Sequence, residues 1–331
     1  MNNTKIPVSV LDLAILRQGE TNRQAIQNVV NLAQTVEELG YNRFWIAEHH
    51  NTPNLASSAT VVLINHVLAH TKRIQVGAGG IMLPNHTPLI VAEQFGTLET
   101  IYPNRLNLGL GRAPGTDMMT ASALRRNQHE SVYTFPDDVK ALLDYFGPEH
   151  KQGYVKAYPG VDTNVPLYIL GSSTDSAHLA ARLGLPYVFA AHFAPEQMKE
   201  AISIYRNLFT PSEYLDKPYV IIGMNVIAAE TDEEAEFLAT STHMMFLSIV
   251  RNSRQPLQPP THDIDAIWSP QEKMMATSRT AASLIGSKET ISKQLEDFQN
   301  QYHADEIIAV SYIYDLDKQR RSYEILKEVT S

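Results

Sequence analysis

The feature that most constrains the fold of this chain is a repeated alternation of short β-rich runs with amphipathic helical patterns. Strand-like runs begin near Val8, Arg43, Ile74 and Arg105, and the alternation continues to a last strand at Glu306–Tyr312 and a closing helix. Repeated units of this kind predict a parallel sheet. About eight such units, with no Gly-x-Gly-x-x-Gly after the first strand, favour a closed (β/α)8 TIM barrel over an open dinucleotide-binding sheet. We therefore expect one TIM-barrel domain over residues 1–331.

Two stretches are longer than a minimal barrel needs. Residues 112–135 follow a strand and are rich in Gly, Thr, Arg and Asn, and residues 251–269 contain Pro256, Pro259 and Pro260. Long loops in compact domains are usually functional or disordered. We interpret both as insertions at the C-terminal face of the barrel, where loops after strands form active sites, and the first as a lid.

Composition excludes several classes of function. The formal net charge is -9, which argues against nucleic acid or an anionic membrane as the main partner. Cysteine is absent, so disulfides, thiolate metal sites and a cysteine nucleophile are excluded. The N-terminus has no apolar signal core and no apolar run is long enough to span a bilayer, so we expect a cytoplasmic protein.

The first candidate site residues are Glu48-His49-His50, which follow the strand-like run ending at Ala47. Catalytic side chains of a barrel lie at the C-terminal ends of strands, and histidine can move a proton near neutral pH. We therefore interpret at least one histidine as functional, although such pairs are also found as structural residues. We predict no metal site here, because adjacent histidines on an extended chain point in different directions and ligand spacing is missing.

Glycines interrupt the strand-like run Val76–Pro84, among them Gly79 and Gly80. Glycine inside a strand marks a bulge or the close approach of a ligand, and a flat ring could lie on such bare backbone. A tight barrel corner that needs glycine for packing explains the same residues equally well.

Two further segments could bind an anion. Arg112 leaves the end of a strand, where a guanidinium can hold a phosphate bidentately, although a solvated loop arginine is common. Gly171-Ser172-Ser173 leads from a strand into a helix that contains Asp175 and Ser176. Helix N-termini bind anions through free N–H groups, but a serine before a helix also serves as an ordinary cap. Asp175 would oppose a phosphate placed too near it.

Taken together, these motifs resemble the bacterial luciferase-like monooxygenase family over most of the chain. The resemblance is clearest in four groups of residues: Phe44–His50; Val76–Pro84; Glu99–Arg105 with Gly109–Arg112; and Gly171–Ser176 with Gly184–Pro186. It implies a (β/α)8 barrel that binds FMN, usually as reduced flavin from a separate reductase, and a homodimer.

The resemblance also implies roles for individual residues. His49 matches the catalytic histidine of the family, and Gly79-Gly80 matches a pair at the flavin ring that is often joined by a non-prolyl cis peptide. The flavin phosphate would contact the residues that match its ligands: Arg112, Ser172, Ser173 and Ser176. The expected reaction is a monooxygenation of a small organic substrate by reduced FMN and O2.

Departures from luciferase itself favour the uncharacterised luciferase-like oxidoreductases. Gly111 stands where luciferase has a reactive cysteine, and an acidic residue of luciferase falls near Ser172. Residues 240–283 do not match its mobile loop, so light emission is not expected. Three alternatives stay open: a deazaflavin (F420)-dependent oxidoreductase, a flavin-binding protein without catalysis, and a metal-dependent hydrolase that uses His49 and His50.

Overall fold

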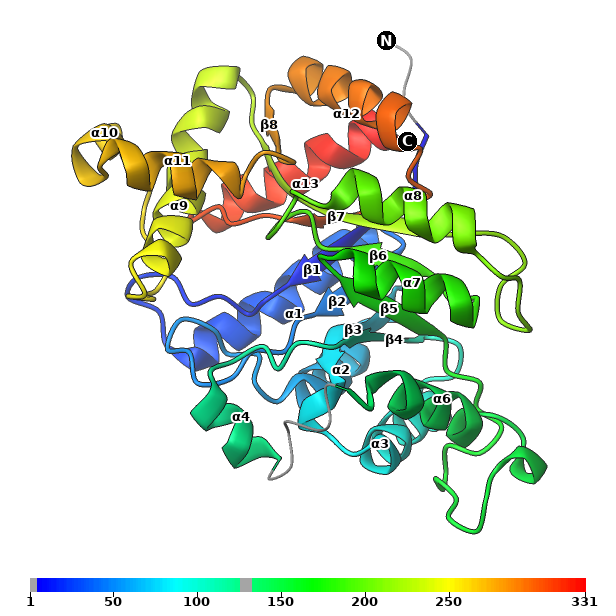
Figure 1. The fold of residues 1–331 in the computed structure, drawn as a ribbon. Helices are drawn as coiled ribbons and strands as arrows, with labels where there is room; N and C mark the ends of the chain where they lie inside the picture. The colour runs from blue at the N-terminus through cyan, green and yellow to red at the C-terminus, as the bar shows by residue number, and fades with distance from the viewer. Residues whose placement is uncertain (1–4, 126–132) are drawn as a thin grey trace.

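The computed structural model describes residues 5–125 and 133–331, and its centre is a closed barrel of parallel strands (Figure 1). The strand order is β6-β5-β4-β3-β2-β1-β9-β7, and pairing between β6 and β7 closes the ring. This confirms the predicted (β/α)8 fold. The barrel strands are β1 (Val8–Asp12), β2 (Arg43–Ile46), β3 (Gln75–Met82), β4 (Leu106–Gly111), β5 (Leu167–Gly171), β6 (Tyr187–Phe189), β7 (Val220–Ala228) and β9 (Glu306–Val310).

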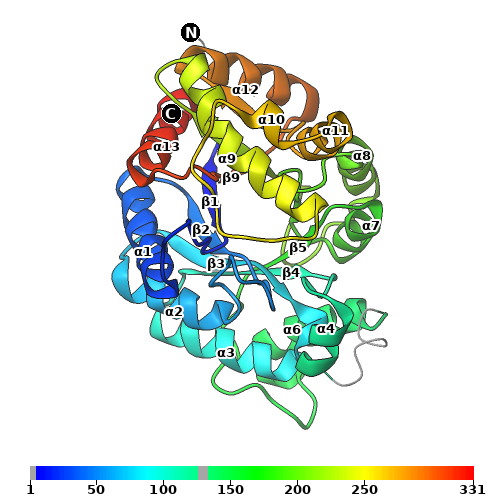
Figure 2. The same ribbon diagram turned by 90° about the vertical axis from the view of Figure 1, so that its left-hand side faces the viewer.

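Helices surround the barrel, as Figure 2 shows from the side of the strands' C-terminal ends. The first is typical of how the sequence sets their limits: Thr21 and Gln24 form a capping box at its start, and Gly40 follows its end with a φ of +76°. No helix within the described ranges is both long and apolar enough to cross a membrane. The helices are α1 (Asn22–Glu38), α2 (Thr60–His70), α3 (Pro88–Ile101), α4 (Met118–Leu124), α6 (Phe135–Phe146), α7 (Thr174–Leu183), α8 (Met198–Leu208), α9 (Asp232–Val250), α10 (Ile264–Ile267), α11 (Pro270–Ser278), α12 (Lys288–Tyr302) and α13 (Leu316–Thr330), with 3-10 turns η1 (Leu83–Asn85) and η2 (Glu149–Lys151).

Some elements differ from the sequence-based expectations. A ninth strand, β8 (Leu284–Gly286), pairs with the far half of β7 and stands outside the ring. Helix α9 continues ten residues past Thr240, and the two long segments contain the short helices α4 and α10. Residues 126–132, part of the predicted lid, lie outside the described residues.

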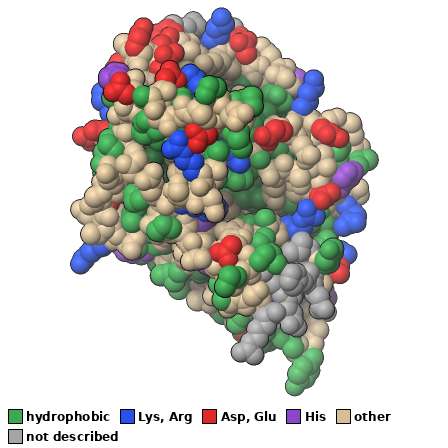
Figure 3. Space-filling model, turned by 60° about the vertical axis from the view of Figure 1, so that its left-hand side comes forward, with side chains coloured by type: hydrophobic (Ala, Val, Ile, Leu, Met, Phe, Trp, Pro, Cys, Tyr) green, Lys and Arg blue, Asp and Glu red, His purple; other side chains and the backbone are tan. Residues whose placement is uncertain are grey.

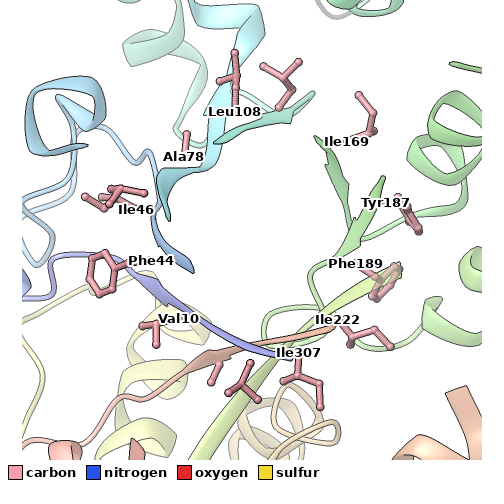
Figure 4. Packing of buried hydrophobic residues seen from close by; sticks show 14 of the residues in the cluster. Val10, Phe44, Ile46, Ala78, Leu108, Ile169, Tyr187, Phe189, Ile222 and Ile307 are labelled. Atoms are coloured by element: carbon pink, nitrogen blue, oxygen red, sulfur yellow. The ribbon is translucent and has the colours of Figure 1, made fainter. Parts of the chain in front are cut away.

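The strands alternate between two apolar layers. Side chains such as Val10, Phe44 and Ile307 point outward and pack against the helices (Figure 4). The next residues along the same strands, among them Leu11 and Trp45, belong to a second buried cluster. Because successive strand residues face opposite sides, this second cluster fills the inside of the barrel.

A buried polar cluster fills the end of the barrel where the strands begin. Arg43 of β2 binds Glu306 of β9 bidentately, with Nε–Oε1 and Nη2–Oε2 distances of 2.8 Å. The same guanidinium donates to the Tyr168 hydroxyl at 2.7 Å and to Asn107 Oδ1 at 3.2 Å, and Ser9 donates to Glu306. Arg43 and Glu306 are buried. This cluster, the barrel floor, leaves the opposite end as the place for a site.

Candidate active site

Glu48, directly after β2, organises one side of the barrel mouth. Its buried carboxylate accepts hydrogen bonds from His50 Nε2 at 2.8 Å, His86 Nε2 at 2.9 Å and the Met82 backbone N–H at 3.0 Å. Burial alone would raise the pKa of Glu48, but the hydrogen bonds from the two histidines outweigh it and lower the pKa to about 2. Glu48 is therefore an anion that ties the loop after β2 to the loop after β3.

The same group has the composition of a metal site. The ligand atoms of Glu48, His50 and His86 all lie within 4.8 Å of one another. However, the Asn85 side-chain amide also donates to Glu48 Oε1 at 3.2 Å, and the Met82 N–H occupies Oε2. Hydrogen bonds thus account for the arrangement, and a cation would have to displace donors that point at the same oxygens. His86 follows η1, just beyond the strand-like run in the sequence. Its position at a strand end was the signal that could have found it.

His49 points into a different environment from its neighbours. Burial lowers its pKa, a backbone hydrogen bond with Gly115 acts in the opposite direction, and the positive charge of Arg254 lowers the pKa further. The imidazole is therefore neutral near pH 7 and able either to take or to give a proton.

A second histidine, His192, lies beside β6 and was not predicted from the sequence. Its backbone N–H donates to Gly223 O at 2.7 Å, and Asn225 Nδ2 donates to His192 O at 3.0 Å. A Cβ atom on Gly223 would lie 2.6 Å from His192 Nδ1, so the ring rests directly on the bare backbone of β7. Among the described residues, that Nδ1 is buried without a hydrogen-bond partner, which makes Nε2 the nitrogen available to a ligand.

Burial lowers the pKa of His192 to about 4, and repulsion from His49 acts in the same direction. A backbone hydrogen bond with Gly223 opposes these two effects without reversing them. The mouth therefore holds two neutral imidazoles that influence each other electrostatically. His192 could have been found from the sequence by the rule that pointed to His49, because it too is a polar residue that follows a strand.

The paired glycines of β3 are packed tightly. The Gly79–Gly80 peptide is cis, which agrees with the resemblance. A Cβ on Gly79 would lie 2.7 Å from Leu11 Cδ1, and one on Gly80 would lie 2.7 Å from the carbonyl oxygen of Gly109. Packing is sufficient to require both glycines, and their contact with a flavin ring stays a prediction.

The predicted phosphate ligands meet where β4 ends and α7 begins. Arg112 Nη2 lies 2.9 Å from Asp175 Oδ2, and both side chains are exposed. The hydroxyls of Ser172 and Ser173 make no hydrogen bond to another described residue, and Ser173 does not cap the helix with its side chain. Ser176 differs, because its hydroxyl donates to Ser173 O at 2.9 Å and contacts the Tyr187 hydroxyl.

Residues 251–263, which we call the strap, run from α9 across this face of the barrel (Figure 2). Leu257 is buried and fixed by backbone hydrogen bonds, from its N–H to Leu16 O at 2.8 Å and from Gln18 N–H to Leu257 O at 2.9 Å. Figure 3 shows this side of the molecule hollowed near its centre, with hydrophobic side chains in the hollow. A recess on the barrel face where His49 follows β2 and His192 follows β6 suits a small organic molecule.

The chain is similar to known proteins in both sequence and fold. Residues 7–304 match the model of the luciferase-like monooxygenase family. The chain is 54% identical to the uncharacterized protein YddN of Bacillus subtilis, over 98% of this chain and 96% of that one. It is 43% identical to a luciferase-like monooxygenase of Escherichia coli, over 99% and 98% of the two chains. The structure resembles apo-MsnO8 with a TM-score of 0.91 and 32% identity, over 98% of both chains.

More distant matches differ in the cofactor that their names give. An N-acetyl-S-alkylcysteine monooxygenase of Bacillus subtilis is 30% identical over 98% of both chains. At 15–16% identity, which shows the fold alone, a Baeyer-Villiger monooxygenase with FMN and an F420-dependent alcohol dehydrogenase both give TM-scores of 0.70, over at least 97% of each chain. On its sequence and its fold, this chain belongs to the luciferase-like monooxygenase family.

Proposed function

We propose that this protein is an FMN-dependent monooxygenase that uses reduced FMN and O2 to oxidise a small organic substrate. One observation carries the proposal: His49 and a group of possible anion ligands lie at the same face of the barrel. His49 is neutral, and the ligands are the N–H groups at the start of α7, the serine hydroxyls beside them and Arg112. The names of an FMN-containing neighbour and of a monooxygenase relative support it.

The described residues fit FMN. Its phosphate would bind at the first turn of α7, held by the hydroxyls of Ser172 and Ser173 and by the guanidinium of Arg112. Arg112 would exchange Asp175 for the phosphate, and this exchange costs little because the pair is solvent-exposed. Ser176 could join the phosphate ligands only by giving up its bond to Ser173 O.

When bound, FMN would supply the redox chemistry with O2. The protein would supply position, proton transfer and the exclusion of water. His49 would hold or release a proton at the imidazole nitrogen not engaged by Gly115, and His192 would offer Nε2 as an uncharged hydrogen-bonding group. The strap would limit the access of water to the recess.

The test is an anaerobic titration of the protein with FMN and with photoreduced FMN, followed by admission of oxygen and a substrate screen. We expect Arg112→Ala to weaken flavin binding and Arg182→Ala, which removes an exposed arginine at the far end of α7, to leave it unchanged. If the protein binds neither FMN nor reduced FMN, the proposal is refuted. If it transfers hydride to F420 without oxygen, an F420-dependent oxidoreductase replaces the monooxygenase as the proposed function.

A separate variant distinguishes catalysis from simple flavin binding. His49→Ala should keep flavin affinity and lose roughly 10²- to 10⁴-fold in turnover, the usual contribution of a general acid or base. Unchanged turnover in this variant would remove His49 from the mechanism. We also propose a separate flavin reductase as partner, to be sought as the protein that restores turnover with NAD(P)H and FMN.

A further inference from the structure

Tyr312 is the last side chain of the β9 region that faces the inside of the barrel. Along β9, Ile308 and Val310 belong to the buried cluster inside the ring, whereas Ala309 between them packs with the outer cluster. Tyr312, two residues past the end of the strand, belongs to the inner cluster as well. Its ring makes an edge-to-face contact with the ring of Phe246 on α9, with centroids 6.5 Å apart and an interplanar angle of 87°. These contacts place the ring inside the C-terminal end of the barrel.

The backbone that carries Tyr312 is fixed by side chains from other parts of the chain. Each of the four backbone carbonyls of residues 311–314 accepts a hydrogen bond from a side chain. Gln319 donates to the first at 2.7 Å, and Thr242 donates to the second at 3.2 Å. The guanidinium of the buried Arg17 donates to the third at 3.2 Å and to the fourth at 2.7 Å. A backbone held at four successive residues gives the Tyr312 ring a fixed position, as a binding residue needs.

The hydroxyl of Tyr312 has no partner, although its ring is buried. Tyr312 is only 5% exposed, yet its hydroxyl makes no hydrogen bond with any residue that the structure describes. This hydroxyl is not sealed from solvent, unlike the buried and unpartnered Oδ1 of Asn225. Buried tyrosine hydroxyls usually find a partner, as those of Tyr41 and Tyr205 do by donating to backbone carbonyls at 2.8 and 2.9 Å. The hydroxyl of Tyr312 is therefore open to a small molecule.

Packing does not account for this hydroxyl. A phenylalanine at position 312 would keep the ring contact with Phe246 and would leave no polar group without a partner. Placing a hydroxyl in apolar surroundings without a hydrogen bond costs free energy. Burial raises the pKa of Tyr312, so the phenol stays protonated and can donate. The tyrosine thus carries a donor that only a bound molecule would use.

The inner wall beside Tyr312 carries no charge. Above the barrel floor, the inward residues of β9 and of its neighbours β1 and β7 are Ile308, Val310, Leu11, Ile221, Gly223 and Asn225. An anion would find no counter-charge on this wall and would be repelled by Asp12, which ends β1 and acts on Tyr312 electrostatically. An ammonium group has no lone pair with which to accept a hydrogen bond from the phenol. The hydroxyl therefore suits an uncharged acceptor.

We propose that Tyr312 is a substrate-binding residue, whose hydroxyl donates a hydrogen bond to an uncharged acceptor atom of an otherwise apolar molecule. The inference rests on the proposed function and adds to it a residue and the kind of group that the substrate carries. The apolar side chains around Tyr312 would hold the body of the substrate, and the single directional contact would fix its orientation in the recess.

The first test needs neither flavin nor substrate, because a hydroxyl without a partner contributes nothing to the folded state. In urea unfolding, Tyr312→Phe should have a midpoint equal to or above that of the wild type. The matched control is Tyr205→Phe, which removes a hydroxyl bonded to Leu185 O and should lower the midpoint. A loss in Tyr312→Phe as large as that in Tyr205→Phe would show that the hydroxyl has a structural partner and would overturn the proposal.

The second test measures binding to the FMN-loaded protein by calorimetry. The probes are acetophenone and cyclohexanone, with ethylbenzene and cyclohexane as counterparts that lack an acceptor. Tyr312→Phe should weaken the binding of at least one ketone by roughly 2- to 10-fold, the effect of losing one neutral hydrogen bond, and leave both hydrocarbons unaffected. Tyr205→Phe should change neither. Unchanged affinity for both ketones in Tyr312→Phe would overturn the proposal.

The same variant separates this inference from the proposed function. Weaker FMN binding in Tyr312→Phe would mean that the acceptor belongs to the flavin, and the proposal of a substrate-binding residue would be wrong. Failure of the wild type to bind FMN would count against the proposed function. The comparison of ketones with hydrocarbons would then be made on the flavin-free protein, where loss of the difference in Tyr312→Phe would still support the role of Tyr312.

Discussion

The contact between His192 and Gly223 gives a quantitative prediction. In Gly223→Ala the new Cβ would lie 2.6 Å from His192 Nδ1 and 3.3 Å from Cε1, whereas Ile308 at 3.5 Å is an ordinary contact. The imidazole must move by roughly 1 Å, but its backbone is held at both N–H and C=O. We expect a loss of about 1–3 kcal/mol in the free energy of unfolding, as for other overpacked sites.

A double-mutant cycle isolates this contact. In the His192→Ala background the obstacle is gone, so Gly223→Ala should cost less than about 0.5 kcal/mol, giving a coupling energy of about 1–2 kcal/mol. Urea unfolding followed by tryptophan fluorescence measures all four proteins. Gly153→Ala, where nothing lies within 4 Å of the new Cβ, is the control. Additive costs in the two backgrounds would show that the ring does not rest on β7 as described.

Three further predictions concern the charged groups of the mouth. Glu48 has a pKa of about 2 in the folded protein and an ordinary value of 4.5, so the stabilisation that its carboxylate contributes is present above pH 4.5 and is lost as the pH falls toward 2. Between pH 5.5 and 3.5 the free energy of unfolding, measured with urea, should fall by about 1 kcal/mol more in the wild type than in Glu48→Gln. Arg254→Gln should raise the pKa of His49, measured by NMR titration, and an unchanged pKa would mean that the strap holds Arg254 elsewhere. A chelator should leave the melting temperature unchanged, because hydrogen bonds account for the cluster of Glu48, His50 and His86. If the purified protein contains stoichiometric zinc, or if a chelator lowers its melting temperature, the cluster is a metal site.

The barrel could be predicted because its signal is local and repeated. Alternating β-rich and helical runs predict eight parallel strands, and this prediction does not depend on which side chains form the site. Strand β8 escaped prediction because three residues, Leu284–Gly286, are too few to show a period. Helix α9 continues through the polar run 240–243 because most of that run is buried against the rest of the fold, and such tertiary burial is not visible in local propensity.

The site could be predicted only in part. The rule that side chains after barrel strands carry function pointed to His49 and Arg112, and it applies equally to His86 and His192. What the sequence could not show is how residues far apart in the chain meet. Glu48 and His86, which share a hydrogen bond, are 38 residues apart, and Leu257 pairs with Leu16 from the far end of the chain. The spatial distances between such residues are set only when the ring of strands closes.

The barrel floor has a consequence for how the chain is made. Arg43 is synthesised 263 residues before its partner Glu306, and burying its guanidinium without that carboxylate would cost about 3–5 kcal/mol. A nascent chain therefore cannot finish its N-terminal strands as a stable half, and we expect a fragment ending at residue 300 to be protease-sensitive throughout its length. Stable folding of the barrel therefore waits until the ribosome has synthesised β9, which contains Glu306.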